Sequence, residues 1–231
     1  MSKHLNRHFA PKTWKIKRKG IKYITKPSPG PHKKSISVPL NVVLRDILDY
    51  ASNNKESRHI LETKNVTIDG IRRKDYRFPV GLFDVLSLNE IDEHFRIILT
   101  KMGKIDLIKV SKDESSIKIC KITGKSVVKG KIQLNLYDGK SKLVTDKSYK
   151  VGDSILLSLG KGKNEIKKHV GLGKNVLVYL TGGKHIGQVG KVQDIKGNRI
   201  VYKSENGDVV ETLKEYAFPV GEEKPLITLS N

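Results

Sequence analysis

The feature that most constrains the fold of this chain is the charge of its first 45 residues, which contain twelve lysines and arginines and no acidic residue. Residues 1–38 also show little apolar periodicity and include the Pro/Gly-rich stretch "PSPGPHKKS". Such a segment cannot bury a hydrophobic core of its own. We therefore expect residues 1–38 to be a basic extension that takes its order from a partner. A solubilising tail is the alternative, but Trp14 and Tyr23 argue against it because such tails tend to lack aromatic residues.

The net charge of the whole chain also indicates the kind of partner. The 231 residues carry a formal charge of +21, and the surplus is concentrated at the N-terminus. A surplus of this size favours a polyanion, because each lysine or arginine that neutralises a phosphate releases a counterion. Nucleic acid is the first candidate. A membrane surface is the alternative, but the sequence has no strongly apolar amphipathic helix, no lipidation signal and no apolar run of about 18 residues.

The cellular compartment follows from two further features. The N-terminus is basic but lacks the apolar core of a secretory signal, and Cys120 is the single cysteine. One cysteine excludes an internal disulfide and fits a reducing environment. We expect a cytoplasmic protein.

Helical patterns are confined to one short region after the extension. The stretch "PLNVVLRDILDYA" predicts a helix from Pro39, "KESRHILETK" predicts a second amphipathic helix, and "VTIDGIRR" predicts a hairpin that turns at Asp69 and Gly70. Two short helices and a hairpin form a compact module, which we assign to residues 39–94.

The rest of the chain is strand-like. "SIKICKI" and "KIQLNLYDGKS" alternate cleanly with lysines on the polar face, which is most simply solvated, and Asp138-Gly139 predicts a hairpin turn. We assign a central β-rich domain to residues 95–172. Residues 173–231 contain four or five strand candidates and an Asn206-Gly207 turn signal, enough for a five-stranded SH3-like barrel. The predicted fold class is therefore α+β and β-rich.

No constellation of residues requires catalysis or a cofactor. In "LTGGKHIGQVGKV", Gly182 and Gly187 have the spacing of a phosphate-binding P-loop, but Gln188 and Val189 stand where lysine and a hydroxyl are needed. A metal site at the paired histidines of "KHLNRHF" is disfavoured by the surrounding cations. Cys120 falls in an alternating strand and is expected to be a buried structural thiol. We expect no metal, no cofactor, no small-molecule substrate and no enzymatic activity.

Several motifs together resemble one protein family. "NVLVYLTGGKHIGQVGKVQDI" resembles the KOW motif, and "NKESRHILETKNVTIDGIRRKD" resembles the second helix and hairpin of the small RNA-binding module of ribosomal protein four. The order of basic arm, module, β-rich middle and KOW motif resembles the eukaryotic and archaeal type of small-subunit ribosomal protein four over essentially the whole chain. The sequence stops at Asn231 without the longer basic tail of eukaryotic members, so it resembles an archaeal member.

This resemblance implies a structural constituent of the small ribosomal subunit that binds ribosomal RNA, contacts neighbouring ribosomal proteins and takes no part in catalysis. The implied contacts lie in three regions. In the arm they are Lys3, Arg7, Lys12, Trp14, Lys15, Lys17, Arg18, Lys19, Lys33 and Lys34; in the module they are Arg45, Lys55, Arg58, Arg72, Arg73 and Lys74; in the KOW loop they are Lys184, His185 and Lys191.

The glycines of the KOW loop have two interpretations that can hold together. By allowing positive φ and removing side-chain bulk they would let the loop backbone approach a phosphate chain. Alternatively, they only make a tight turn of the barrel. The glycines concerned are Gly182, Gly183, Gly187 and Gly190.

Two other functions remain as alternatives. An RNA-modifying enzyme can use the same small module as an adaptor, but it needs a catalytic domain with a positioned aspartate, and the β-rich middle is too short and too lysine-rich for one. A transcription elongation factor can carry a KOW domain, but it would not need an acid-free basic arm.

Overall fold

The computed structural model describes residues 4–160, 165–204 and 207–229. Strands predominate and helices are few, which confirms the β-rich α+β class. The chain divides into two compact units, one formed by Met1–Ile98 with Lys104–Ser116 and the other by Leu99–Gly103 with Ile117–Asn231. The four-part division expected from the sequence is finer than this and stays a prediction. No helix among the described residues is long and apolar enough to cross a membrane.

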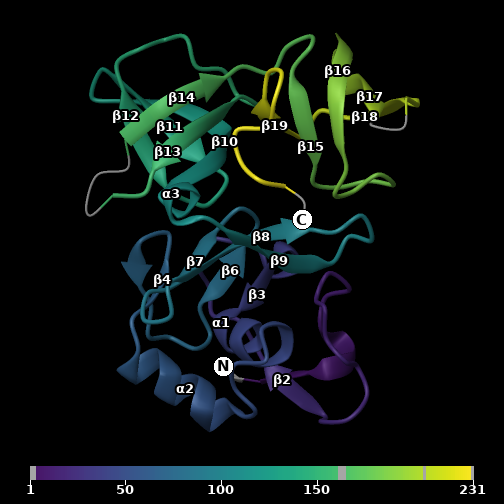
Figure 1. The fold of residues 1–231 in the computed structure, drawn as a ribbon. Coiled ribbons are helices and arrows are strands. Elements are labelled where there is room, and N and C mark those ends of the chain that lie inside the picture. The colour runs from purple at the N-terminus through teal and green to yellow at the C-terminus, as the bar shows by residue number, and fades with distance from the viewer. Residues whose placement is uncertain (1–3, 161–164, 205–206, 230–231) are drawn as a thin grey trace. The chain divides into compact units, whose positions relative to one another are not determined.

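The first unit contains a five-stranded sheet, with α1 (Leu40–Val42) and α2 (Asn54–Thr63) on one side of it (Figure 1). The three inner strands β4, β7 and β8 are buried along almost their whole length. Asp69 and Gly70 both have positive φ, 52° and 75°, so the predicted hairpin turn is confirmed. In sheet order the strands are β5 (Ile71–Arg72), β4 (Val66–Ile68), β7 (Val85–Leu88), β8 (Glu93–Leu99) and β9 (Ile105–Val110).

The first predicted helix is present but changes its winding. It begins as α1 (Leu40–Val42) and continues as the wider turn η3 (Val43–Ile47). The Leu48 N–H donates to the Val43 carbonyl five residues back, at 3.0 Å. Arg45 and Asp46 on this wide turn are partly exposed, while Leu44 stays buried.

The second predicted helix is confirmed as α2 (Asn54–Thr63). The Asn53 side chain accepts hydrogen bonds from the backbone N–H groups of Lys55 and Glu56, at 2.9 and 3.0 Å. Glu56 in turn accepts from the Ser52 N–H at 2.7 Å. These reciprocal bonds satisfy the open donors at the start of the helix and fix where it begins.

The N-terminal segment is packed into the first unit, which corrects the expectation that it takes its order from a partner. Trp14 is only 2% exposed, and its indole Nε1 donates to the Ser37 carbonyl at 2.7 Å. His32 is also buried, with Nε2 at 3.0 Å from both carboxylate oxygens of Asp84. The residues that hold the segment come from distant parts of the chain, so its own sequence shows no periodicity.

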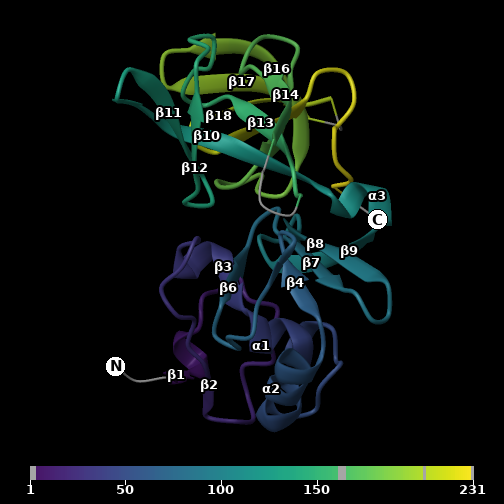
Figure 2. The same ribbon diagram turned by 90° about the vertical axis from the view of Figure 1, so that its left-hand side faces the viewer.

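Short strand pairs and single turns complete this segment. Figure 2 shows β1 beside β2, and β3 beside β6. The elements are β1 (His4–Asn6), η1 (Arg7–Phe9), β2 (Tyr23–Thr25), η2 (Lys34–Ile36), β3 (Ser37–Pro39) and β6 (Pro79–Gly81), and the short helix α3 (Lys112–Ser115) follows β9.

The second unit contains two five-stranded antiparallel sheets. The first has a core of Cys120, Ile122, Leu134, Ile155 and Leu157, so the expected buried thiol is confirmed. In sheet order its strands are β12 (Ser141–Val144), β11 (Lys131–Leu136), β10 (Ile117–Val128), β13 (Ser154–Ser158) and β14 (Glu165–Val170).

The other sheet supplies the five strands expected in the C-terminal part. Val178, Val192, Ile200 and Ala217 form its core. Gly207 has the positive φ expected of its turn, 91°, while Asn206 lies outside the described residues. In sheet order the strands are β18 (Val209–Leu213), β17 (Arg199–Ser204), β16 (Val189–Lys196), β15 (Leu177–Leu180) and β19 (Ala217–Gly221).

Two lysines of β10 are not on a solvated face, which corrects the simplest interpretation of the alternating pattern. Lys118 is 1% exposed, and its Nζ lies 3.2 Å from a carboxylate oxygen of Asp138 in the confirmed β11–β12 turn. Burial favours the neutral acid, but the Lys118 and Lys140 ammonium groups outweigh it and hold the pKa of Asp138 below its usual value. Lys121 donates to the backbone carbonyls of Glu215 and Ala217, at 2.8 and 2.6 Å, and burial lowers its pKa to about 8.

Candidate nucleic-acid interface

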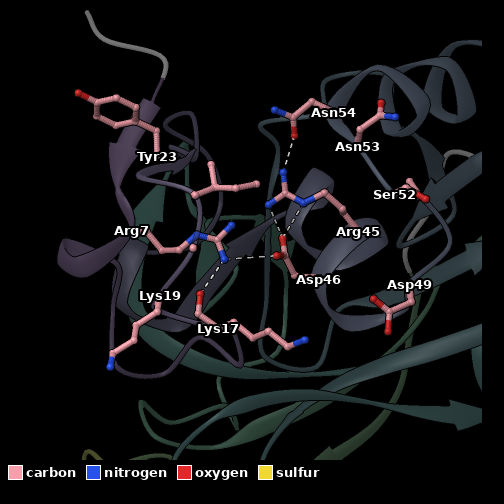
Figure 3. Close-up of a pocket in the computed structure, with 13 residues that line it drawn as sticks. Arg7, Lys17, Lys19, Tyr23, Arg45, Asp46, Asp49, Ser52, Asn53 and Asn54 are labelled. Carbon is pink, nitrogen blue, oxygen red and sulfur yellow. Dashed lines mark hydrogen bonds and ion pairs between the residues drawn. The ribbon is translucent and has the colours of Figure 1, made fainter.

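Basic residues of the N-terminal segment and of the α1–α2 region line one cavity of about 620 Å³ in the first unit, shown in Figure 3. We call this cavity the basic groove. Four cationic side chains and two carboxylates contribute to it, so its walls are positive overall. The lining residues are Arg7, Lys17, Lys19, Gly20, Ile21, Tyr23, Arg45, Asp46, Asp49, Ala51, Ser52, Asn53 and Asn54.

Asp46 orients both arginines of the basic groove. Its carboxylate lies 3.6 Å from Nη1 of Arg7 and 2.5 Å from Nη2 of Arg45 (Figure 3). Arg7 also donates to the Lys17 carbonyl at 2.7 Å, and Arg45 donates to Oδ1 of Asn54 at 2.6 Å. These contacts hold the two guanidinium groups in fixed positions before any ligand arrives, so a ligand would not have to order them.

The rim of the basic groove adds exposed lysines and an aromatic ring. Lys17 and Lys19 are exposed, as is Ile21 at 69%. Tyr23 is 46% exposed, and its ring packs edge to face against His4 with the centroids 4.5 Å apart. A rim of this kind combines phosphate-binding charge with a surface on which a base can stack.

Sequence reasoning placed Arg7, Lys17, Lys19 and Arg45 among the RNA contacts, and the structure brings these four together around the basic groove. The sequence prediction did not include Tyr23, Asn53 or Asn54 among the site residues. The signal available for Tyr23 was its place among basic residues in "KRKGIKY", since RNA-binding segments often combine basic and aromatic side chains. Nothing in the sequence pointed to the asparagines beyond their capping position before a helix.

The remaining predicted contacts of the arm have different surroundings. Trp14 is corrected: its buried, hydrogen-bonded indole leaves no ring face for a base. Arg18 donates to the carbonyls of Ala10 and Pro11, both at 2.8 Å, and so holds a loop of its own segment. Lys15 is paired with Asp106 at 2.6 Å. Lys12, Lys33 and Lys34 are exposed, and Lys3 lies outside the described residues.

Three arginines predicted in the module contact their own chain. The guanidinium of Arg58 lies over the Tyr76 ring at 4.1 Å, and that of Arg73 lies over the Phe78 ring at 4.4 Å. Arg72 donates to the backbone carbonyls of Glu62 and Lys64 at the end of α2, at 3.1 and 3.4 Å. Lys55 and Lys74 are exposed.

The glycine-rich loop between β15 and β16 belongs to the second unit, and protein atoms explain most of its glycines. Gly183 and Gly187 have positive φ, 82° and 77°, whereas Gly182 and Gly190 do not. A Cβ at Gly182 would lie 2.6 Å from the Tyr216 ring.

The other two positions are similarly crowded: a Cβ at Gly187 would meet the Thr100 carbonyl, and one at Gly190 would meet the Tyr202 ring. The tight-turn interpretation thus has direct structural support. Lys184 and Lys191 are exposed beside this turn, and His185 is half-buried.

The described part of the chain contains no group of three or more histidine, cysteine or acidic residues that could hold a metal ion. His4, instead of pairing with His8 for a metal, packs against Tyr23.

The β-rich fold is shared with a solved ribosomal protein. The crystal structure of the 30S ribosomal protein S4e from Thermoplasma acidophilum matches it with a TM-score of 0.70 at 29% identity, covering 84% of this chain and 98% of that chain. Residues 91–164 match ribosomal family S4e, and residues 1–35 match the RS4NT domain.

Two archaeal relatives match nearly the whole length. The small ribosomal subunit protein eS4 of Methanococcus aeolicus is 42% identical over 98% of this chain and 97% of its own length. The protein of the same name from Methanosphaera stadtmanae is 42% identical over 98% of this chain and 95% of its own. The chain belongs to the ribosomal protein S4e family, which confirms the resemblance drawn from the motifs.

Proposed function

We propose that this protein is a structural constituent of the cytoplasmic small ribosomal subunit, where it binds ribosomal RNA and neighbouring ribosomal proteins. The observation that carries this proposal is the 42% identity, over 98% of the chain, to a small ribosomal subunit protein of Methanococcus aeolicus. The charge of +21 supports it, because a surface of that charge is suited to a phosphate backbone. The role requires no catalysis.

The proposed RNA contacts fall into two classes by their surroundings. Exposed lysines outside the groove, such as Lys12, Lys33, Lys55 and Lys74, are point charges that neutralise phosphates and add affinity without reading sequence. The guanidinium groups of the basic groove are fixed by Asp46 and present their donors in one arrangement. Fixed donors discriminate between RNA shapes better than mobile ones, so we assign positioning to the lysines and recognition to the basic groove.

The finer organisation is part of the proposal. We assign a basic arm to residues 1–38, the ribosomal-protein-four type of RNA-binding module to 39–94, a central β domain to 95–172 and an SH3-like KOW barrel to 173–231. The barrel assignment is supported by five consecutive antiparallel strands and a tight glycine turn between the β15 and β16 strands. In this assignment Lys184, His185 and Lys191 present polar donors from the KOW loop.

Sedimentation of a native cell extract on a sucrose gradient tests the proposal. We expect the protein to travel with small subunits and to remain with them after a high-salt wash, as an integral component should. Recovery at the top of the gradient, or with RNA polymerase, would contradict it and favour the enzyme or transcription alternatives.

A further inference from the structure

The basic groove contains a buried arginine, Arg7, that its own chain satisfies only in part. Arg7 is 95% buried, yet its Nε has no hydrogen-bond acceptor among the described residues. Buried polar atoms are nearly always paired, because leaving one without a partner destabilises the fold. Arg7 lines the basic groove, where its guanidinium faces Asp46 (Figure 3). Arg7 is therefore a buried cation at the wall of the groove with hydrogen-bonding capacity that its own chain leaves unused.

The charges in the groove favour an anionic ligand. Asp46 is paired with both Arg7 and Arg45. Of the other charged side chains that line the groove, Lys17 and Lys19 are positive and Asp49 is negative, so the groove has a net positive charge. The start of the ten-residue helix α2 also borders the groove through Asn53 and Asn54, but its first donors are capped by Asn53 and the Glu56 carboxylate lies beside it, so the attraction for an anion comes from the lysines.

The shape of the groove excludes double-stranded RNA from its interior. The phosphates of a duplex lie on a convex surface and would reach only the exposed rim lysines. Arg7, at 5% exposure, can be reached only by a group that enters the cavity. The volume of about 620 Å³ is within the range of roughly 300 to 1,000 Å³ of pockets that enclose small molecules. A single nucleotide turned out of its helix matches this size.

The rim provides what such a nucleotide needs. Tyr23 exposes almost half its surface beside the groove, and aromatic side chains stack on unpaired bases. We propose that the basic groove holds one unpaired nucleotide of an RNA bulge or loop, with its phosphate near Arg7 and the rim lysines and its base against Tyr23. This inference rests on the proposed function, since it specifies which RNA element the protein recognises.

Fluorescence anisotropy with the full chain tests the inference. The probes are a fully paired RNA hairpin, the same hairpin with one bulged nucleotide carrying each of the four bases in turn, and a free 5′-mononucleotide. We expect at least one bulged hairpin to bind at least fivefold more tightly than the paired one. Equal affinity for paired and bulged hairpins would overturn the inference and leave the proposed RNA binding standing. Equal affinity for the free mononucleotide and the bulged hairpin would also overturn it.

Two variants of Tyr23 test whether base stacking contributes to the preference for the bulged hairpin. Tyr23→Ala should remove most of the preference for the bulge, because base stacking on an aromatic is worth about 1 to 3 kcal/mol, or roughly five- to a hundredfold in affinity. Tyr23→Phe keeps the ring and should keep the preference, which distinguishes lost stacking from a disturbed fold. If Tyr23→Ala weakens both hairpins equally, the inference fails.

A charge-matched pair completes the design. Lys17→Ala/Lys19→Ala removes two charges from the groove, and Lys129→Ala/Lys131→Ala removes two exposed charges from the β10–β11 turn. Only the first pair should reduce the ratio of bulged to paired affinity. Equal ratios in both double variants would refute the groove as the site. Failure of the unaltered chain to bind any RNA would contradict the proposed function itself.

Discussion

Replacing Lys12, Lys17 and Lys19 together with glutamine should remove phosphate contacts. RNA binding should therefore become weaker and less dependent on salt. All three side chains are exposed, so they are available to phosphates. Each phosphate neutralised contributes about −0.7 to −0.9 to the slope of log affinity against log salt concentration. If each lysine makes one contact, the slope should become shallower by roughly 2 to 2.7.

Lys15 provides an internal contrast within the same segment. Its ammonium lies 2.6 Å from a carboxylate oxygen of Asp106, so it already has a counterion in the protein. Lys15→Gln should therefore change the slope by less than the roughly 0.7 to 0.9 expected for one phosphate contact. Substitution is preferable to deleting residues 1–34, because deletion would remove Trp14 from the core of the first unit.

The assay is fluorescence anisotropy with a labelled fragment of small-subunit ribosomal RNA, titrated at several potassium chloride concentrations. Circular dichroism checks that each variant is folded. The reasoning would be refuted if the triple variant kept the slope of the unaltered chain, or if Lys15→Gln alone changed it as much as the triple variant did.

Three further predictions concern stability, each measured by urea denaturation followed by circular dichroism. Trp14→Ala should lower the free energy of unfolding by about 3 to 5 kcal/mol, and a loss below about 1 kcal/mol would contradict its place in the core. Gly187→Val should destabilise by more than about 2 kcal/mol because φ is 77° and a backbone carbonyl occupies the Cβ position, whereas Gly197→Ala, with φ of 58° and open space, should cost only about 1 kcal/mol. Asp138→Asn should cost about 3 to 5 kcal/mol at neutral pH, because it removes the negative charge that faces the buried Lys118 ammonium group. The pKa of Asp138 in the folded protein lies below its ordinary value of 3.8, so the Lys118–Asp138 pair contributes its full stability above about pH 5. The difference in unfolding free energy between the unaltered chain and Asp138→Asn should therefore become smaller as pH falls below about 4. A difference that does not change with pH would contradict this.

The elements that the sequence predicts well are those specified by neighbouring residues. The α2 helix has its cap at Asn53, and the hairpin turn at Asp69 and Gly70 has the backbone angles that those residue types favour. The alternating strands from β10 onward are present for the same reason: a period of two in the sequence is sufficient to place one face inward.

The sequence predictions were wrong where residues far away in the chain determine whether a side chain is buried. Trp14 was expected at an RNA surface, but its partner Ser37 is 23 residues away, and the parallel bridge of Trp14 to Ile105 spans a much longer distance. Lys118 was expected in solvent, but Asp138 in the next hairpin draws it into the interior. Neither pairing leaves a local pattern in the sequence.

The candidate site was predictable in composition but not in shape. The basic residues of the arm and Arg45 could be selected by charge, whereas the groove they form depends on β1–β2 pairing and on the wide turn η3. Asp46 is the first acidic residue of the chain, and only the structure shows that it orients Arg7 and Arg45.

The most direct test of the central claim is ultraviolet crosslinking of purified small subunits, followed by mass spectrometry of the peptides of this protein that carry RNA. We predict crosslinked peptides from residues 12–23 and 52–58, the two segments that supply the rim of the basic groove and the start of α2. If the protein is present in the subunits but its crosslinks fall only elsewhere in the chain, the assignment of the RNA-binding surface to this groove is wrong.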